Sequence, residues 1–220
     1  MKAYLILAVL IALLSCNSHS SKENAVMRPE TIKVHDTIYL PPDNYDWQES
    51  FGLTHNPEID SVWNKPVSYY IYDKDCSGLA FDFYHGILRP SDNGSTTELL
   101  KLAVTENRKL RPFYRWCLNK TLIVSDGALG ELTGVPARQY AEKFPDEFFE
   151  YLDSTDDGSK YKMWTEAIAY SGFYDYTDYN KEKMNCKRLE EKMAGNLKSR
   201  TPKNILRVKK FARDCTTFPF

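Results

Sequence analysis

The pattern of hydrophobic and polar positions divides the chain into three parts. An almost unbroken apolar run extends from Leu5 to Leu14 and follows a basic residue, Lys2. Residues 31–92 contain many aromatic residues without a clear period. From residue 93 onward, apolar residues recur at intervals of three and four, which is the period of an amphipathic helix. We therefore expect a short leader, an extended or irregular portion over 31–92, and a helical portion over 93–220.

The helical portion is predicted to contain six or seven helices of about 8–18 residues. Residues 95–98, Ser-Thr-Thr-Glu, match a capping box before the first of them. Ser159 is expected to cap a later helix, and Thr201-Pro202 to begin the last one. Three further prolines stand where a first-turn proline opens a helix: Pro112, Pro136 and Pro145. Helices joined by short turns predict a mainly α domain, either a bundle or a short stack of helix pairs.

Three predicted helices have apolar stripes that are expected to face the core. The first stripe contains Phe113, Trp116, Cys117 and Ile123 or Val124, with Lys120 as its polar break. A helix from about Lys181 to Lys198 places Cys186, Leu189, Met193 and Leu197 on one face. The last helix turns Ile205, Val208, Phe211, Ala212 and Cys215 inward. The segment GALGELTG, residues 127–134, is interpreted as a connection between helices.

The irregular portion contains the candidates for β-structure. Residues 31–42 end in two prolines and are predicted to be extended, as an edge strand. Residues 66–73, PVSYYIYD, are the best strand candidate because tyrosines and β-branched residues lie between a proline and an aspartate. Residues 77–87 fit either a strand or a buried helical turn.

The leader has the features of an export signal. Its apolar run of about ten residues is too short to cross a bilayer, which needs about 20 helical residues, but it has the length of a signal-peptide core. The residues Leu13-Leu14-Ser15-Cys16 then resemble the lipobox of bacterial lipoproteins. That resemblance covers only residues 1–16, and it implies that Cys16 becomes the mature N-terminus and carries acyl chains. The alternative is a plain signal peptide followed by an unrelated cysteine.

The resemblance to lipoproteins also predicts where the protein resides. Several acyl chains on Cys16 would hold the protein firmly on a membrane, because each buried methylene contributes about 0.8 kcal/mol. Asn17 is not the aspartate that retains many such lipoproteins at the inner membrane, so the outer membrane is favoured. The sequence after the cysteine lacks the acidic run that often accompanies surface display, so a periplasmic orientation is expected. Residues 16–30 are then the lipidated cysteine and a polar, flexible tether.

Four cysteines remain besides Cys16, an even number in an oxidising compartment, so two disulfides are expected. Three connectivities are open, and we favour Cys186 with Cys215 because both lie in the last two predicted helices. A catalytic thiolate is correspondingly disfavoured. The disulfide candidates are Cys76, Cys117, Cys186 and Cys215.

Composition and charge narrow the possible functions. The 220 residues are 42% hydrophobic and 27% charged, which is ordinary for a folded domain. A formal net charge of −1 argues against a general nucleic-acid binder. The charge is nevertheless segregated: residues 134–180 contain ten acidic and four basic residues, and residues 181–213 contain twelve basic and three acidic ones. We expect these two segments to attract each other in the fold.

No strong catalytic or metal-binding motif is present, and no cofactor is expected. The four histidines are scattered through the first 85 residues without ligand spacing. A group of carboxylates and one histidine is the remaining enzymatic candidate, in the manner of a carbohydrate-cleaving site, although a charged loop is the simpler interpretation. These residues are Asp73, Asp75, Asp82 and His85.

An aromatic and acidic segment is the most informative feature for binding. Residues 170–180, YSGFYDYTDYN, contain five aromatic residues in eleven, and such clusters suit protein recognition. The alternative is a connection between helices whose rings cover the core. The partner-binding candidates are Tyr170, Phe173, Tyr174, Asp175, Tyr176, Asp178 and Tyr179.

Three functions are compatible with these features. The first is a non-enzymatic, membrane-anchored periplasmic lipoprotein that binds another protein, in one form an immunity-type inhibitor of a secreted toxin. The second is a carbohydrate-binding or carbohydrate-active envelope lipoprotein that uses the segment between Tyr69 and His85. The third is a structural envelope lipoprotein without a specific ligand.

Overall fold

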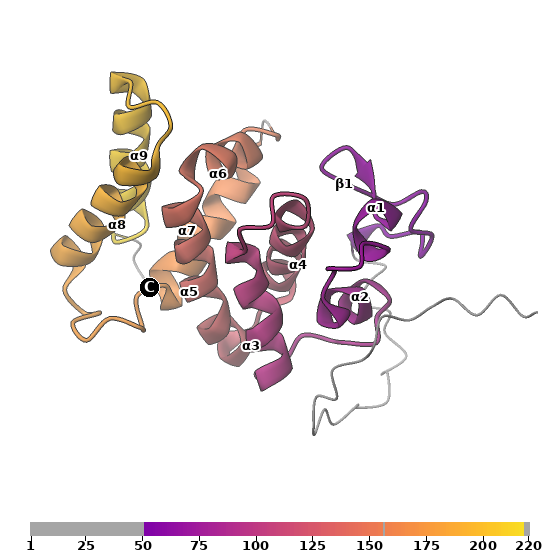
Figure 1. Cartoon of the computed structure of the whole chain (residues 1–220). Helices are drawn as coiled ribbons and strands as arrows, with labels where there is room; N and C mark the ends of the chain where they lie inside the picture. Colours follow the sequence, from indigo (N-terminus) through magenta and orange to yellow (C-terminus); the bar gives the residue numbers. More distant parts are fainter. Residues whose placement is uncertain (1–50, 156, 218–220) are drawn as a thin grey trace, which may run out of the picture. The chain divides into compact units, whose positions relative to one another are not determined.

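The computed structural model describes residues 51–155 and 157–217, which lie within one compact unit, Thr31–Phe220. These residues form nine α-helices, one short 3-10 helix and a two-stranded sheet, so the predicted mainly α fold is confirmed (Figure 1). Within 51–155 and 157–217, no helix has both the length and the apolar character needed to cross a bilayer. The leader, Cys16, the tether and the edge strand expected at 31–42 lie outside the described residues.

A β-hairpin precedes the α-helices, and in it β1 (Ser61–Val62) pairs antiparallel with β2 (Lys65–Pro66). Helices α1 (Ser68–Ile71) and α2 (Gly78–Tyr84) follow. The strand expected over 66–73 is therefore wrong beyond Pro66. Positions 67, 70 and 71 are buried and positions 69 and 72 are exposed, which is the i, i+3, i+4 spacing of a helix. Burial on one helical face thus outweighs the β-propensity of the tyrosines and isoleucine.

Residues 77–87, which fitted either a strand or a helical turn, form helix α2, and the Ser77 hydroxyl caps it by accepting the Leu79 N–H. Helix α3 (Gly94–Lys101) begins earlier than the capping box predicted. Asn93 is its N-cap, and the Asn93 carboxamide oxygen accepts the Thr96 N–H at 2.9 Å. The capping-box interpretation of residues 95–98 is therefore wrong, because Asn93 already satisfies the free N–H of the first turn.

The 3-10 helix η2 (Leu102–Val104) leads into α4 (Arg111–Val124), and Pro112 lies in its first turn as expected. The buried face of α4 differs from the predicted stripe. Thr121 and Leu122 are buried, whereas Ile123 is half-exposed. The buried side of α4 thus continues from Phe113 and Cys117 to Thr121, at intervals of four.

Helices α5 (Gly127–Lys143), α6 (Pro145–Leu152) and α7 (Ser159–Ser171) follow. Pro145 opens α6 as predicted, whereas Pro136 lies inside α5 and opens no helix. The segment 127–134 is accordingly the first half of α5 and not a connection between helices. Asp126 starts α5 early by accepting the Leu129 N–H, and the helix continues through Pro136 although an interior proline removes one backbone hydrogen bond and crowds the carbonyl four residues before it. The N-cap of α7 is Gly158, so the expected cap Ser159 is instead the first helical residue.

Two glycines in α5 allow α7 to approach its backbone closely. A Cβ atom at Gly134 would lie 2.4 Å from the Ala167 carbonyl oxygen and from the Gly172 nitrogen. The Ser171 hydroxyl accepts the Gly134 N–H at 3.1 Å and donates to the Gly130 carbonyl at 2.8 Å. The α5–α7 contact is therefore a backbone-to-backbone contact, held together by one buried hydroxyl.

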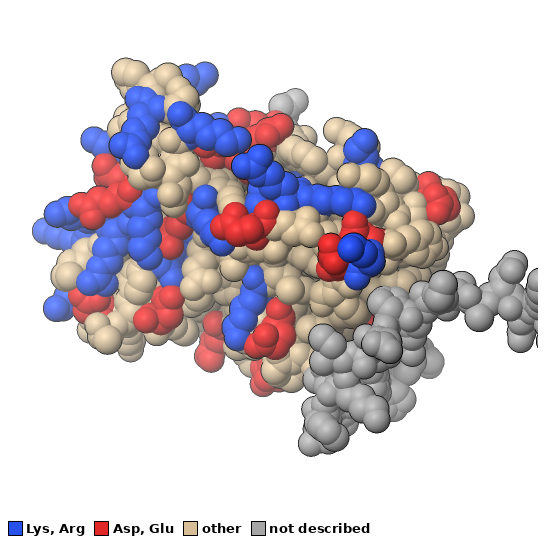
Figure 2. Space-filling view, viewed as in Figure 1, with Lys and Arg blue, Asp and Glu red and all other residues tan. Residues whose placement is uncertain are grey.

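Helices α8 (Glu182–Asn196) and α9 (Pro202–Asp214) pack against each other at the C-terminal end of the unit (Figure 1). Both lie within two residues of their predicted ends, and Thr201 caps α9 by accepting the Asn204 N–H, as expected. Lys and Arg gather over these two helices, with Asp and Glu among them (Figure 2). Arg207 pairs with Asp153, and Lys192 pairs with Glu142. Ion pairs thus join the basic and acidic segments, as the segregation of charge predicted.

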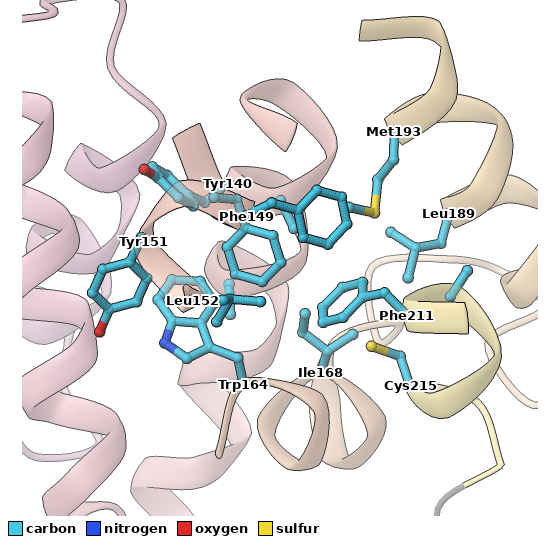
Figure 3. Packing of buried hydrophobic residues seen from close by; sticks show 14 of the residues in the cluster. Tyr140, Phe149, Tyr151, Leu152, Trp164, Ile168, Leu189, Met193, Phe211 and Cys215 are labelled. Atoms are coloured by element: carbon cyan, nitrogen blue, oxygen red, sulfur yellow. The ribbon is translucent and has the colours of Figure 1, made fainter. Parts of the chain in front are cut away.

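The buried side chains form two hydrophobic clusters. One lies among α1, α2, α3 and the first half of α4, and contains Tyr70, Phe83 and Phe113. The other joins α4 to α9 and is built around Trp164 and Phe148, whose ring centroids are 5.1 Å apart (Figure 3). The predicted inward residues Leu189, Met193, Leu197, Val208, Phe211, Ala212 and Cys215 all belong to this second cluster, and Cys186 and Ile205 pack against it.

Candidate functional site

A cleft of about 920 Å³ is lined by the β-hairpin, α4, α6 and the start of α7. Two residues of α9, Asn204 and Arg207, also line it. These five elements contribute the side chains that define it. The side chains are Trp63, Arg115, Trp116, Asn119, Lys120, Tyr151, Lys160 and Arg207. Its volume is within the range of small-molecule sites in proteins.

The hairpin turn places an indole ring over the cleft. Its two central residues, Trp63 and Asn64, have φ angles of 52° and 60°, as a type I′ turn requires. Asparagine tolerates this left-handed conformation, but a bulky side chain such as tryptophan is strained there by about 1–3 kcal/mol. The strained turn holds the Trp63 ring 4.6 Å from the guanidinium carbon of Arg115.

Arg115 is the central residue of the cleft. It projects from α4, is only 2% exposed, and also lies 4.2 Å from the Tyr151 ring, so two aromatic faces contact one cation. Its Nη1 atom donates to the Tyr140 hydroxyl at 3.0 Å and lies 3.7 Å from a Glu147 carboxylate oxygen. Its Nε atom is buried and has no hydrogen-bond partner among the described residues.

The partly buried carboxylate of Glu147, which lies beside Arg115, is already engaged by other groups. Glu147 accepts two hydrogen bonds from Arg111, at 2.8 and 3.0 Å, and one from the Tyr140 hydroxyl at 2.8 Å. Burial raises the pKa of Glu147, but these hydrogen bonds and the charges of Arg111 and Arg115 outweigh it and hold the pKa below its usual value. The single carboxylate of Glu147 thus forms ion pairs with both Arg111 and Arg115, so the positive charge of Arg115 is only partly compensated.

Two lysines add positive charge to the cleft. Lys160 Nζ lies 4.6 Å from the Tyr151 ring and donates to the Ser154 hydroxyl at 2.5 Å. Burial and the nearby charge of Arg115 lower its pKa. Lys120 contacts the Phe51 and Trp116 rings, and burial lowers its pKa as well. Neither lysine has a carboxylate within ion-pair distance among the described residues.

Asn119 has a fixed orientation at the wall of the cleft. Its carboxamide oxygen accepts hydrogen bonds from the Tyr151 hydroxyl and from the Trp164 indole nitrogen, the latter at 3.1 Å. Figure 3 shows this nitrogen and this hydroxyl on the same side of the hydrophobic cluster. Because the oxygen is the acceptor of both bonds, the amide nitrogen of Asn119 keeps its two N–H groups for other acceptors.

Acidic residues line the α6 side of the cleft. Asp153 is bound by both terminal nitrogens of Arg207, and Asp146 accepts the Lys198 backbone N–H at 2.9 Å. Glu150 also lines the cleft. The cleft is therefore positive around Arg115 and Lys160 and mixed in charge toward α9.

The aromatic and acidic segment that the sequence indicated is only partly a free surface. Phe173 is buried, and Tyr176 lies in a buried network with Arg138 and Glu142. The two rings that remain about half-exposed are Tyr174, at 49%, and Tyr179, at 54%, and their centroids are 5.7 Å apart.

The two aspartates of this segment are engaged within the fold. Asp175 pairs with the buried Arg138 at 2.6 Å, and Asp178 pairs with Arg188 at 2.6 Å. Arg138 also donates to the Gly172 carbonyl at 2.7 Å. Asp175 and Asp178 thus hold the α7–α8 connection against α5 and α8, which reduces the charge they present to a partner. Tyr170 contacts α5 through the Gly127 carbonyl at 3.4 Å.

The structure joins no two of Cys76, Cys117, Cys186 and Cys215 by a disulfide. Cys76 and Cys117 belong to the first hydrophobic cluster, and Cys215 belongs to the second, with Cys186 packed against it. Burial raises the pKa of Cys76 to about 12, and it raises the pKa of Cys117 and Cys215 as well. These buried thiols are poor nucleophiles. The two predicted disulfides remain a proposal.

The carboxylate group proposed for carbohydrate chemistry does not line the cleft. Asp73 forms an ion pair with Lys109 at 2.5 Å, and the Asp73 carboxylate also accepts a hydrogen bond from the Asp75 backbone N–H. Burial lowers the pKa of His85, whose ring packs against Phe81. Within the described residues, no group of three or more His, Cys, Asp or Glu side chains is arranged to hold a metal ion.

Comparison of the chain with protein-family models, with curated proteins and with solved structures gives no match. The cleft therefore has no counterpart from which to take a ligand, and its chemistry has to be argued from its own residues. Sequence reasoning had identified none of Trp63, Arg115, Asn119 and Lys160 as site residues.

Proposed function

We propose that the protein is a lipid-anchored component of the bacterial cell envelope whose helical domain binds another protein without catalysing a reaction. The leader and the lipobox Leu13-Leu14-Ser15-Cys16 support the anchor. The residues that follow favour the outer membrane and a periplasmic orientation. A specific form of the proposal is an immunity-type inhibitor that neutralises a toxin entering the periplasm.

The observation that carries the binding proposal is the exposed pair of rings at Tyr174 and Tyr179. Their connection is held by ion pairs on both sides, so the two phenols are presented on an ordered segment. Ordered tyrosines provide a large contact area and a polar group at low entropic cost, which favours protein recognition. Of the seven candidate residues, these two are the ones we propose to contact the partner directly.

Lipidation is tested by Cys16→Ser in the bacterium that encodes the protein. The variant should move from the membrane fraction to the soluble fraction and keep its helical circular dichroism, because only the acyl attachment site is lost. Cys186→Ser is the matched control and should stay with the membrane. A Cys16→Ser protein that still sediments with membranes would contradict the anchor.

Partner binding is tested with full-length protein solubilised in detergent, first by affinity capture from an envelope extract and then with the purified partner. The double variant Tyr174→Ser/Tyr179→Ser should weaken the measured affinity by about tenfold or more, since aromatic residues contribute most strongly to such interfaces. Tyr72→Ser is the control, because Tyr72 is similarly exposed, at 62%, but lies in the α1 region. Equal affinities for the wild type and the double variant would exclude the Tyr174–Tyr179 surface.

A further inference from the structure

We propose that the cleft is a binding site for a small molecule that carries a carboxylate or phosphate group, held by Arg115, Lys160 and Asn119. This ligand would bind apart from the Tyr174–Tyr179 surface, through residues that the proposed function does not use.

The first argument is the unused donor of Arg115. Buried polar groups in proteins nearly always have a hydrogen-bond partner, and an exception needs an explanation. Arg115 lines the cleft and is 98% buried, yet its Nε has no acceptor among the described residues. Among residues 51–155 and 157–217, the one hydrogen bond of this side chain is made by its Nη1 atom. The edge formed by Nε and Nη2 therefore has no acceptor among the described residues. In other arginines this is the edge that binds a carboxylate or a phosphate with two parallel hydrogen bonds.

The second argument is positive charge that is only partly compensated. Arg115 and Lys160 both lie within 5 Å of the Tyr151 ring, at 4.2 and 4.6 Å. The charge of Arg115 lowers the pKa of Lys160, which means that the two positive groups repel each other. Glu147 is occupied by Arg111 and Tyr140. An anion bound in the cleft beside Arg115 and Lys160 would reduce this repulsion and supply the missing acceptor.

The surroundings of these two cations indicate the rest of the ligand. The N–H groups of Asn119 are oriented by the two bonds that its oxygen accepts, so they can donate to the same anion. Trp63 and Trp116 line the cleft and offer flat apolar faces, on which a sugar or another ring can stack. Asp146, Glu150 and Asp153 line the α6 side of the cleft and would repel an extended polyanion. These features favour a compact ring-containing ligand with one anionic group.

Isothermal titration of the full-length protein in detergent tests this proposal with three probes of equal ring size. Glucuronate carries a carboxylate, glucose 6-phosphate carries a phosphate, and glucose carries neither. At least one anionic probe should bind with a millimolar or tighter dissociation constant, while glucose should bind at least about tenfold more weakly, because the charge-assisted contacts are missing. The response of the two anionic probes distinguishes a carboxylate site from a phosphate site. Failure of both to bind, or equal binding of glucose, would overturn the proposal.

Variants assign the binding to this cleft. Lys160→Met removes one cation, and Arg115→Lys keeps the charge but removes the planar two-donor edge, so each should weaken anion binding by about tenfold. Lys162→Met is the matched control on the same helix, since Lys162 lies outside the cleft and is mostly exposed. If Arg115→Lys does not fold, Lys160→Met decides the question, and unchanged binding by that variant refutes the site. The Tyr174→Ser/Tyr179→Ser variant should bind the anion normally, which separates this site from the proposed protein interface.

Discussion

Replacing Gly134 with alanine should lower the free energy of unfolding by about 3 kcal/mol or more, at the upper end of the range for overpacking. The added methyl carbon would lie 2.4 Å from the Ala167 carbonyl oxygen, the Gly172 nitrogen and the Ser171 hydroxyl. Two of these three atoms belong to the backbone of α7 and its C-terminus, so they cannot rotate away. Helices α5 and α7 would have to separate, and the Ser171 hydrogen bonds to Gly130 and Gly134 would be lost.

Urea denaturation followed by circular dichroism measures this effect, with Gly195→Ala as the matched control. Gly195 lies in α8, where an added Cβ meets no atom within 4 Å. Alanine is the better helix former, so this control should be as stable as the wild type or more stable by up to about 1 kcal/mol. If Gly134→Ala unfolds at the same urea concentration as Gly195→Ala, the close contact of α5 with α7 is incorrect.

Replacing Trp164 with alanine should destabilise the domain by about 3–5 kcal/mol, as for other buried aromatic residues. Trp164 is fully buried, and its ring lies within 6 Å of the rings of Tyr140, Phe148 and Tyr151. Its indole nitrogen also helps to orient Asn119 at the cleft wall. The truncated side chain would therefore leave a large cavity where α4, α5, α6 and α7 meet.

Trp164→Phe separates the packing contribution from the hydrogen bond. The phenyl ring fills most of the space, so this variant should lose clearly less stability than Trp164→Ala in the same urea experiment. Asn119 keeps its bond from the Tyr151 hydroxyl in both variants. Equal losses for the phenylalanine and alanine variants would show that packing around Trp164 is not what stabilises the cluster.

The helices were predictable where local signals and burial agree. The first-turn prolines of α4, α6 and α9, and the Thr201 cap of α9, lie directly beside apolar periods, so the starts of these helices follow from a few adjacent residues. At α5 the signals conflict: Pro136 resembles a helix start, yet Asp126 begins the helix ten residues earlier. Gly130 and Gly134 disfavour a helix by their intrinsic propensity. They are needed because α7 packs closely against α5 at these positions, and this contact cannot be seen in the local sequence.

The cleft was not predictable because its residues come from separate segments. Trp63 and Arg115 are 52 positions apart, and Lys160 is a further 45 positions along the chain. Arg115 also occupies a buried helical position, where sequence reasoning expects an apolar residue. By contrast, the composition of the aromatic segment at 170–180 predicted a binding surface. Two of its rings instead pack within the fold: Phe173 is buried, and the Tyr176 hydroxyl bonds to the buried Glu142.

Helix α4 contributes to both hydrophobic clusters, with Phe113 and Cys117 in one and Leu118 and Leu122 in the other. Neither cluster can lose its structure without disturbing this helix, so we expect the two to unfold together as one cooperative unit. The cleft residues Arg115 and Asn119 lie on the same helix. Amide hydrogens in the middle of α4 should consequently exchange with solvent only through global unfolding, and a ligand held by Arg115 would slow that exchange throughout the domain.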